Sequence, residues 1–455
     1  MINKLKIEFL DVVTPSDTAV SAARTCYAAK GLVKPEKSAQ WARKDSLLSS
    51  VFEAGHHTTL QHTHITMMIE GMSRHLIWRL LHGHPYYNSE QVSQRYAKMS
   101  SDAFVYPKSE DNDAWQKYYE AQYNDYEKLI DLLMDDASAN TPKFRQKDVP
   151  KKAQEMARYV LPGGMSAYLY HTVNIVTLLR YIGVAQTLEE CSAEAKEFVQ
   201  IISEKLIDLD PSLKPLIEHA QNSKPKWAKS TLSKIKKNHN IQEDDKVVVY
   251  DAVGTFEVET SNNYADVLRF SQMIPDEGVL GGFSTYIKLS LSADAQNQRH
   301  RKSPAIRPML EENYKRSFYT PPLIEKNEEA LKVYNNSIQR SYDFFESQTE
   351  KIGFSEAIYA LSNAHEIELV ERNDFSSFHH KAQMRLCYNA QQEIFDIVYE
   401  QVKQLKEKNI EGANEFLPPC TVRAANKIYP ICPEGSRFCG IKVWKLDFED
   451  YKRNI

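Results

Sequence analysis

The stretch that decides the fold is EMARYVLPGG, residues 155–164, because a related stretch, EAIYALSNAH, returns at residues 356–365. Each of the two precedes a helical pattern with an asparagine near its start, VNIVTLLRYI in the first case and RNDFSSFHHKAQMRL in the second. Self-similar segments that recur in one order are the signature of a repeated unit. The sequence therefore predicts two copies of one fold in a single chain.

Further matches surround this pair in the same order. IEFLDVVTPSD (7–17) resembles VVVYDAVGTFE (247–257), and TMMIEGMSRHL (66–76) resembles TYIKLSLSADA (285–295). Both copies then reach a long pattern with apolar residues at helical spacing, AEAKEFVQIISEKLIDL and AQQEIFDIVYEQVKQLKEK. Two unrelated arrays of strands and helices can share such an order by chance, but four matches in one order favour duplication.

The boundary between the copies is visible in the composition. Residues 219–246 are polar, rich in lysine and poor in large apolar side chains, which is typical of a linker or a short solvated helix. We therefore expect an N-terminal domain over 1–220, a linker over 221–245 and a C-terminal domain over 246–410. A cysteine-containing extension then covers 411–455.

The totals exclude several classes of protein. The net charge is −4 over 455 residues, which argues against a general nucleic-acid binder because such proteins carry a basic surplus. No apolar run approaches the roughly 18 residues that span a bilayer. Six cysteines do not make a disulfide scaffold in a chain of this length. These features predict a cytoplasmic enzyme that binds neither nucleic acid nor membranes.

A basic cluster stands out against the acidic total. Residues 294–308 read DAQNQRHRKSPAIRP and contain Arg299, His300 and Arg301. Neighbouring cations repel one another unless water or an anion screens them. A hydrated loop is one interpretation. A phosphate cradle is favoured because the preceding stretch is half apolar, and partly buried arginines need partners.

Other polar residues suit an anion as well. Ser93 and Arg95 are two residues apart, so they share one side of an extended segment, and a hydroxyl with a guanidinium suits a phosphate or a carboxylate. A solvated Ser-x-Arg is the alternative. Arg158 and Arg385 are lone arginines in apolar or helical stretches, where structural ion pairs are equally possible. The histidines over 56–64 lack a His-Glu-x-x-His pattern, so we predict no metal there.

Together these residues resemble the flavin-dependent thymidylate synthases. The resemblance rests on two sets of positions, which cover most of both copies. The first copy matches at Gly55, His56, Thr58, His62, Ser73, Arg74, Glu90, Ser93, Arg95, Tyr96, Ala157, Arg158, Leu161, Pro162 and Asn174. The second copy matches at Gln296, Arg299, His300, Arg301, Arg385, Ala390, Gln391, Glu393 and Ile394.

Each copy departs from the family pattern where the other keeps it. HGHP (82–85) replaces the Arg-His-Arg triplet in the first copy. In the second copy Met309 replaces the motif serine and Ile358 replaces the arginine of Ala-Arg-x-x-Leu-Pro. The arginine of the family's Asn-x-Arg is missing from both copies, at Val176 and Phe375. This complementary loss predicts one composite site built from both copies.

The resemblance implies an α+β fold in each copy, with an antiparallel sheet and long helices. It implies methylation of dUMP at C5, with methylenetetrahydrofolate as carbon donor, NADPH as reductant and FAD as cofactor. Arg385 would be catalytic and would stabilise negative charge on the uracil. The substrate-binding residues would be Ser93, Gln94, Arg95, Arg158, Gln296 and Arg299. The FAD-binding residues would be His56, Thr58, Glu90, Asn174, Arg299, His300, Arg301 and His380.

Alternatives stay open beside this prediction. The same chemistry can act on another pyrimidine nucleotide or use another one-carbon donor. A third interpretation is that this chain is a non-catalytic protein that binds flavin or nucleotide. The resemblance also implies a homodimer, in which four copies of the fold form a pseudo-tetramer. Cys420, Cys432 and Cys439 could hold a zinc ion, although they lack a Cys-x-x-Cys pair, and packed, reduced thiols are the alternative.

Overall fold

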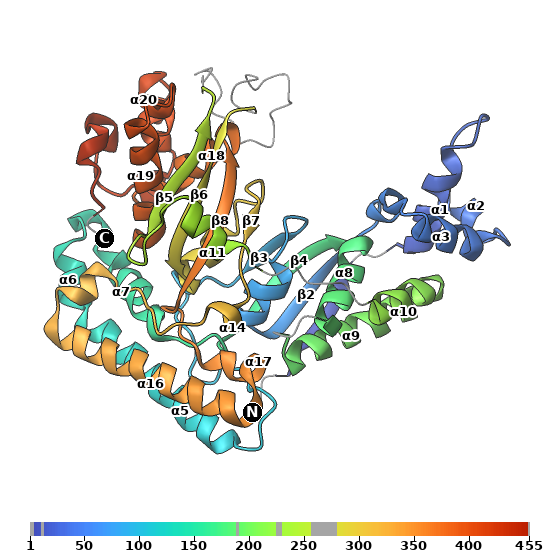
Figure 1. Cartoon of the computed structure of the whole chain (residues 1–455), viewed down its shortest axis with the longest axis horizontal. Coiled ribbons are helices and arrows are strands. Elements are labelled where there is room, and N and C mark those ends of the chain that lie inside the picture. The colour runs from blue at the N-terminus through green and yellow to red at the C-terminus, as the bar shows by residue number, and fades with distance from the viewer. Residues whose placement is uncertain (1–3, 11–12, 188–190, 224–229, 256–279, 454–455) are drawn as a thin grey trace.

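Two four-stranded antiparallel sheets dominate the computed structural model, which describes residues 4–10, 13–187, 191–223, 230–255 and 280–453 (Figure 1). The strand order is β1-β2-β4-β3 in the first sheet and β5-β6-β8-β7 in the second. The two orders are equivalent strand by strand. The predicted α+β fold in two copies, with antiparallel sheets and long helices, is therefore confirmed.

The first half of the chain, up to Asn222, contains one sheet and the helices around it. Its elements are β1 (Lys6–Leu10), α1 (Pro15–Thr25), α2 (Pro35–Ala39), α3 (Lys44–Glu53), η1 (His57–Gln61), β2 (His64–Ser73), α4 (Arg74–Leu76), η2 (Ile77–Leu81), β3 (Asn88–Gln91), α5 (Asn112–Leu132), α6 (Met134–Ala139), η3 (Lys143–Asp148), α7 (Val149–Ala157), η4 (Arg158–Val160), β4 (Ser166–Asn174), α8 (Ile175–Thr187), α9 (Ala193–Leu209), η5 (Pro211–Leu213) and α10 (Lys214–Asn222).

The second half repeats this plan after α11 (Leu232–Asn238). Its elements are β5 (Val247–Val253), β6 (Gly282–Ser290), α13 (Leu291–Asn297), β7 (Ala305–Ile306), α14 (Leu310–Asn313), α15 (Pro322–Glu325), α16 (Glu328–Ile352), α17 (Phe354–Ala357), η8 (Ile358–Ala360), β8 (Glu366–Asp374), α18 (Phe375–Arg385) and α19 (Gln392–Glu407). The C-terminal extension adds η9 (Ala413–Glu415), α20 (Pro419–Ala425), η10 (Gly435–Arg437), η11 (Val443–Lys445) and η12 (Phe448–Asp450).

Equivalent helices begin with equivalent caps. The Asn174 side chain accepts a hydrogen bond from the Thr177 N–H at the start of α8, and Asp374 accepts one from Ser377 at the start of α18. Short polar side chains at this position satisfy backbone N–H groups that the helix itself leaves without acceptors. The cap of α18 is thus Asp374 and not the asparagine before it.

The register of the second repeat match needs a correction. Met68 of β2 pairs with Tyr170, and its equivalent Tyr286 of β6 pairs with Val370, so the two stretches align one residue away from the predicted match. The difference grows to two residues after Gly71, where β2 contains a bulge and φ is 77°, so that Ser73 is equivalent to Ser290. A Cβ at this position would lie 2.8 Å from the Lys4 carbonyl oxygen, so the bulge requires glycine.

The two halves join through the stretches that revealed the repeat. The Gly163 N–H donates to the Leu361 carbonyl, and Asn363 donates to Leu161 in return. Gly164 donates to the Tyr359 carbonyl at 2.9 Å, and the equivalent Ala364 donates to Tyr159 at 3.0 Å. Reciprocal bonds of this kind are typical of a two-fold relation, here within one chain.

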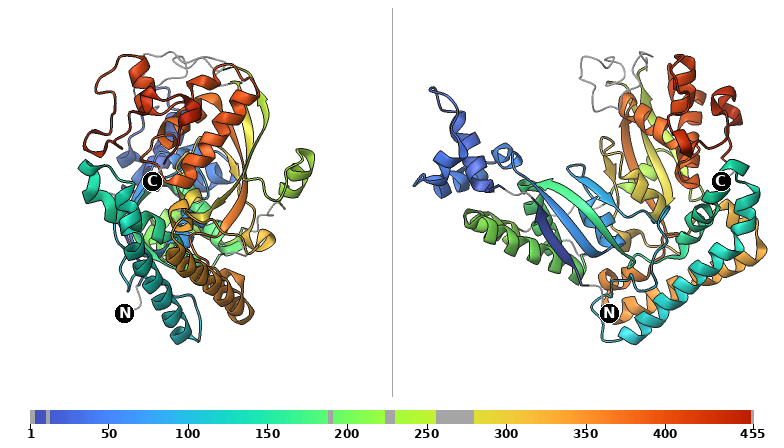
Figure 2. Two further views of the ribbon diagram at one scale, coloured as in Figure 1. Left: turned by 90° about the vertical axis from the view of Figure 1, so that its left-hand side faces the viewer. Right: turned by 180° about the vertical axis from the view of Figure 1, so that it is seen from behind.

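One hydrophobic core belongs to both halves. The long helices α5 and α16 lie side by side beneath the two sheets, and Tyr118 stacks on Phe344 with ring centroids 4.3 Å apart (Figures 1 and 2). Asp111 caps α5 and Asn327 caps α16, each through a side-chain oxygen. Because the core is shared, the relative position of the two sheets follows from packing and not from the linker alone.

The division into domains stays a proposal, with ranges 1–220, 221–245, 246–410 and 411–455. Helix α11 lies in the proposed linker, of which residues 224–229 fall outside the described residues, as do residues 256–257 of the first repeat match. Among the described helices, none combines the length and the apolar character that a bilayer crossing demands.

Candidate active site

Arg385 lies at the C-terminal end of α18, between the two halves. Its Nε donates to Nε2 of His300 at 2.8 Å, and its Nη2 donates to the Gln296 carbonyl at 2.8 Å. His300 therefore accepts through Nε2, and burial together with Arg385 holds the pKa of this histidine well below its usual value. Burial, followed by the charges of Arg95 and Arg299, lowers the pKa of Arg385 to about 10. A cation in such surroundings favours an anion beside it.

The first half contributes Arg95 to the same place. Its Nη2 donates to the Asn389 carbonyl of the second half at 2.6 Å, and its Nε forms an ion pair with Glu155 at 2.7 Å. The Ser93 hydroxyl accepts from the Arg95 N–H at 3.2 Å, so the predicted pair of residues is held together. Arg95 thus connects α7 with the loop that follows Arg385.

The basic triplet of the second half contacts β3 of the first. Arg299 donates to the Ser89 carbonyl at 2.6 Å and forms an ion pair with Glu90 at 2.8 Å. Arg301 donates to the Asn88 side chain at 3.1 Å. The His380 ring lies 6.0 Å from the His300 ring, measured between centroids. Residues about 200 positions apart in the sequence are therefore in contact here.

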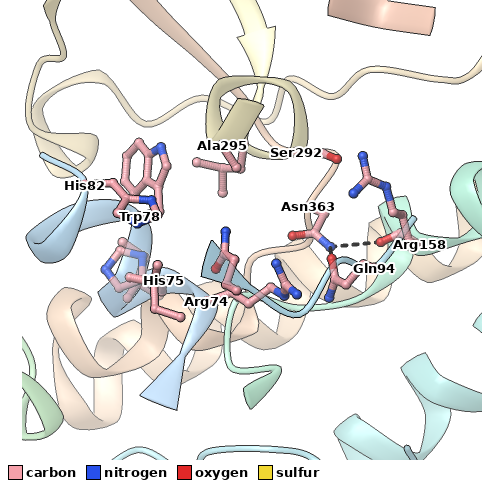
Figure 3. Close-up of a pocket in the computed structure, with 14 residues that line it drawn as sticks. Arg74, His75, Trp78, His82, Gln94, Arg158, Ser292, Ala295 and Asn363 are labelled. Carbon is pink, nitrogen blue, oxygen red and sulfur yellow. Dashed lines mark hydrogen bonds between the residues drawn. The ribbon is translucent and has the colours of Figure 1, made fainter. Parts of the chain in front are cut away.

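A small cavity of about 50 Å³ lies beside this cluster, lined by residues of both halves (Figure 3). Arg158 is buried here, and its Nε and Nη2 have no hydrogen-bond partner among the described residues. The Asn363 side chain fixes the neighbourhood by donating to the Arg158 carbonyl at 2.9 Å and to Gln94 Oε1 at 3.1 Å. Buried guanidinium N–H groups without acceptors are costly, so this arrangement suits an anionic ligand.

Some neighbours of the site were not predicted. The predicted Gln296 donates to Gln391, which in turn donates to the hydroxyl of Tyr159, a residue that the sequence did not single out. Glu155 also escaped prediction, although it precedes Arg158 by one helical turn and so shares its face of α7. The spacing of Glu155 and Arg158 could have revealed Glu155 from the sequence. Asn389 could not be found in this way, because Arg95 contacts its main-chain carbonyl, which every residue has.

Two equivalent carboxylates cross between the halves. Glu393 accepts from the Ser290 N–H and hydroxyl, and from the Tyr159 hydroxyl at 2.8 Å. Glu194 accepts in the same way from Ser73 and from the Tyr359 hydroxyl of the other half. Burial raises the pKa of Glu393 to about 7 and that of Glu194 to about 6, although these hydrogen bonds oppose it.

Three of the predicted FAD-binding residues lie far from the cluster around Arg299 and Arg385. His56 and Thr58 belong to or adjoin η1, which packs on α1 and α8, and Asn174 caps α8 at the same end of the first half. Helix α1 projects away from α18 at the opposite side of the molecule (Figures 1 and 2). Within one chain, the structure therefore does not bring these residues to Arg299.

A cavity of about 640 Å³ lies at the place equivalent to the cluster around Arg299 and His300; residues of both halves line it, and we call it the mate pocket. Because Ser89 pairs with His171 and Ala305 pairs with Glu371 at equivalent positions of the sheets, Met309 takes the place of Ser93. Met309 lines the mate pocket together with Gly83, His84, Arg180 and Glu312.

The cysteines of the extension are reduced thiols. Burial raises the pKa of Cys420 to about 11, which disfavours the thiolate that zinc requires. Within the described part of the chain, no group of three or more His, Cys, Asp or Glu residues is arranged to hold a metal ion.

Comparison with known proteins identifies the family. Residues 8–212 and 280–409 match the model of the family described as thymidylate synthase complementing protein, so the match covers more than half of the chain and falls in both halves. The chain belongs to this family. The position of the two matched segments agrees with the two copies of the fold, one on each side of the linker.

Other members of the thymidylate synthase complementing protein family are similar over part of the chain. The flavin-dependent thymidylate synthase of Clostridium tetani is 28% identical over 183 residues, which are 39% of this chain and 72% of the relative. That of Geobacter sulfurreducens is 26% identical over 217 residues, 47% of this chain and 85% of the relative. One relative therefore corresponds to roughly half of this tandem chain.

Solved structures are similar over a comparable share. The UMP/dUMP methylase PolB from Streptomyces cacaoi bound with 5-Br dUMP aligns with a TM-score of 0.37 and 16% identity, covering 49% of this chain and 99% of that one. Thymidylate Synthase X from Helicobacter pylori with FAD and dUMP aligns with a TM-score of 0.36 and 17% identity, covering 48% and 100%.

Proposed function

We propose that the protein is an FAD-dependent thymidylate synthase, which methylates dUMP at C5 at a composite site made by both halves of one chain. The carbon donor would be methylenetetrahydrofolate and the reductant NADPH. The family supports this type of reaction. The observation that carries the composite site is the meeting of Arg95 and Arg158 from the first half with Arg299 and Arg385 from the second.

The nucleotide phosphate would bind at Arg158, whose Nε and Nη2 have no acceptor among the described residues, with Ser93, Gln94 and Arg95 beside it. Guanidinium groups bind phosphate through paired, charge-assisted hydrogen bonds. Arg385 would face the uracil and stabilise negative charge at N3 or O2, which makes C5 a better nucleophile toward the one-carbon unit. The carbonyl of Gln296 and the neutral His300 hold Arg385 in one orientation, and Arg299 adds positive charge near the nucleotide.

The residues fit a flavin dinucleotide in their chemistry. Arg299 and Arg301 offer positive charge for a diphosphate, and His300 and His380 offer flat rings near Arg385. Glu90 stands beside Arg299. When bound there, FAD would supply the redox step that converts the transferred carbon into a methyl group. Val176 and Phe375 stand where the family has an arginine. The positive charge that binds the diphosphate would therefore come from Arg299 and Arg301.

The remaining flavin residues would come from a second chain. His56, Thr58 and Asn174 lie at the far end of the first half, so we propose a homodimer in which they reach the triplet of the partner. Mixing an inactive Arg385→Ala protein with an inactive His56→Ala protein would then restore activity through mixed dimers. Recovery no greater than the sum of the two variants would contradict this dimer.

The reaction is tested by tritium release from C5 of labelled dUMP in the presence of FAD, methylenetetrahydrofolate and NADPH. Release with dUMP and not with UMP supports thymidylate synthesis. Release with UMP alone assigns the chemistry to another pyrimidine nucleotide. A colourless protein that cannot be reconstituted with FAD and releases no tritium contradicts the proposal and favours a non-catalytic relative.

A further inference from the structure

A cavity of about 290 Å³ lies on the other side of Arg95, outside the cluster around Arg385. Its walls come from three parts of the chain: η3 with α7, the loop at Tyr388 and Asn389, and the C-terminal extension. The family match ends at residue 409, so the third wall is an addition to the family's fold. The volume is close to the lower end of small-molecule sites, about 300 Å³.

The extension is firmly attached as a wall of this cavity. Buried Arg453 donates through Nε to the Tyr388 carbonyl at 3.0 Å and pairs through Nη2 with Glu155 at 3.3 Å. Asn389 donates to the Arg437 carbonyl at 2.7 Å, and Arg145 donates to the Asn389 side chain at 2.9 Å. These bonds connect the extension to both halves, so the cavity has a defined shape.

Positive charge exceeds negative charge around the cavity. The lining contains three carboxylates, Asp148, Glu155 and Glu434, and six cations, Arg95, Arg145, Lys151, Lys152, Arg437 and Arg453. Two of the carboxylates are each shared by two cations. Glu155 pairs with Arg95 at 2.7 Å and with Arg453 at 3.3 Å. Asp148 pairs with Arg145 at 2.9 Å and with Lys151 at 3.8 Å.

The excess of positive charge around the cavity affects the pKa of Lys152, one of the six cations. Burial, followed by the charges of Arg453 and Arg145, lowers the pKa of Lys152 to about 8. Glu155 and Asp148 oppose this effect without overcoming it. A bound anion would relieve the repulsion, since opposite charge within a few ångströms favours the charged form of an amine.

We propose that this cavity binds a polyanion, a short oligophosphate or oligocarboxylate, next to the nucleotide site. Several guanidinium and ammonium groups on converging walls match the several charges of such a ligand. Because Arg95 lines the cavity and also contacts the loop after Arg385, a ligand here would lie beside the active site without occupying it.

The test measures binding of sodium tripolyphosphate and of γ-linked triglutamate to the full-length protein by calorimetry at constant ionic strength. Lys152→Met and Arg437→Gln should each weaken the binding about tenfold, the usual effect of removing one charged partner. Lys117→Met, which removes an exposed lysine of α5, should leave it unchanged. Melting temperatures identify any variant that fails to fold, and the two cavity variants act as independent checks.

Binding of tripolyphosphate alone assigns an oligophosphate, and binding of triglutamate alone assigns an oligocarboxylate. Binding of both, weakened by the two cavity variants, supports a general polyanion site. The proposal is overturned if neither probe binds more tightly than sulfate, or if Lys117→Met weakens binding as much as Lys152→Met. Since Lys152 has no place in the nucleotide site, this result does not depend on whether dUMP is the substrate.

Discussion

The candidate active site and the mate pocket occupy equivalent places in two equivalent sheets, yet their side chains differ. Arg299, His300 and Arg301 of the first correspond to Gly83, His84 and Pro85 of the second. Arg385 corresponds to Ala185, because β4 with α8 and β8 with α18 align without a gap. The backbone pairing is therefore the same in both sheets, while a few side chains distinguish the two pockets. A buried charge without a ligand destabilises the fold, which explains its loss from the mate pocket.

The buried side chains beneath the two sites also differ in charge at one pair of equivalent positions. The second half contains a buried ion pair, with Lys381 Nζ 2.5 Å from Glu371 Oε1. The first half has a neutral hydrogen bond at the same positions, between Tyr181 and His171 at 2.9 Å. Burial raises the pKa of Glu371, but Lys381 and the neighbouring amide donors outweigh it and bring the pKa to about 2. At this pair of equivalent positions the second half thus holds opposite charges, whereas the first half holds two neutral groups.

Replacing Lys381 should have the largest effect on the free energy of unfolding. Lys381→Met leaves the Glu371 carboxylate buried and unpaired, so we expect the free energy of unfolding to fall by about 3–5 kcal/mol. The equivalent change Tyr181→Phe removes a hydroxyl that contacts only neutral partners, His171, His84 and the Leu81 carbonyl, and should cost about 1–2 kcal/mol. Urea unfolding measures both. Equal costs for the two variants would contradict the contrast between charged and neutral interiors.

Arg385 should separate the two pockets by activity. Arg385→Ala removes the guanidinium that faces the developing charge, so kcat should fall about 100- to 1,000-fold. Arg180→Ala, which removes a guanidinium from the mate pocket, should leave kcat within about twofold. Tritium release from dUMP reports both rates. A comparable loss in the Arg180 variant would show that the mate pocket takes part in the reaction.

The two crossing carboxylates should differ in their dependence on pH. Because the folded pKa of Glu393 is about 7 and the usual value is 4.5, the folded state holds a proton that the unfolded state releases. The stability that each carboxylate contributes is therefore greatest below pH 4.5 and is lost as the pH rises through its folded pKa. The loss is about 3 kcal/mol for Glu393, complete near pH 7, and about 2 kcal/mol for Glu194, complete near pH 6.

Urea unfolding between pH 5 and pH 8 tests this difference, since Glu194 completes its change near pH 6. Glu393→Gln should flatten the profile between pH 6 and pH 7, whereas Glu194→Gln should flatten only the part below pH 6. An unchanged slope between pH 6 and pH 7 in the Glu393 variant would show that another group titrates there.

The smallest effect is expected where one half receives the residue of the other. Arg158→Ile installs the side chain that stands at the equivalent position 358, and it should raise the KM for dUMP about tenfold through loss of a charged phosphate contact. Stability should not fall, because burial already lowers the pKa of Arg158 and its Nε and Nη2 have no partner in the part of the chain that the structure describes. Ile358→Val is the matched control. An unchanged KM would remove Arg158 from the phosphate site.

Much of the fold was predictable because duplication leaves a local record. Alternation in the strands, helical spacing and the order of the motifs are properties of short segments, and each copy repeats them. The register of β2 was not predictable, since the bulge at Gly71 depends on the close approach of Lys4 from another strand. The helix cap at Asp374 was missed by one residue for a related reason: the asparagine before it gave a plausible match in sequence.

Two copies of one fold, each lacking motif residues that the other keeps, can be recognised from the order of the residues alone. Folding brings four arginines of the two halves together within one chain, namely Arg95, Arg158, Arg299 and Arg385. It leaves His56, Thr58 and Asn174 far from Arg299 of the same chain. It also decided that Arg453 of the extension shares Glu155 with Arg95. The physical reason is that such contacts join residues hundreds of positions apart, and their geometry follows from how the two halves pack on their common core.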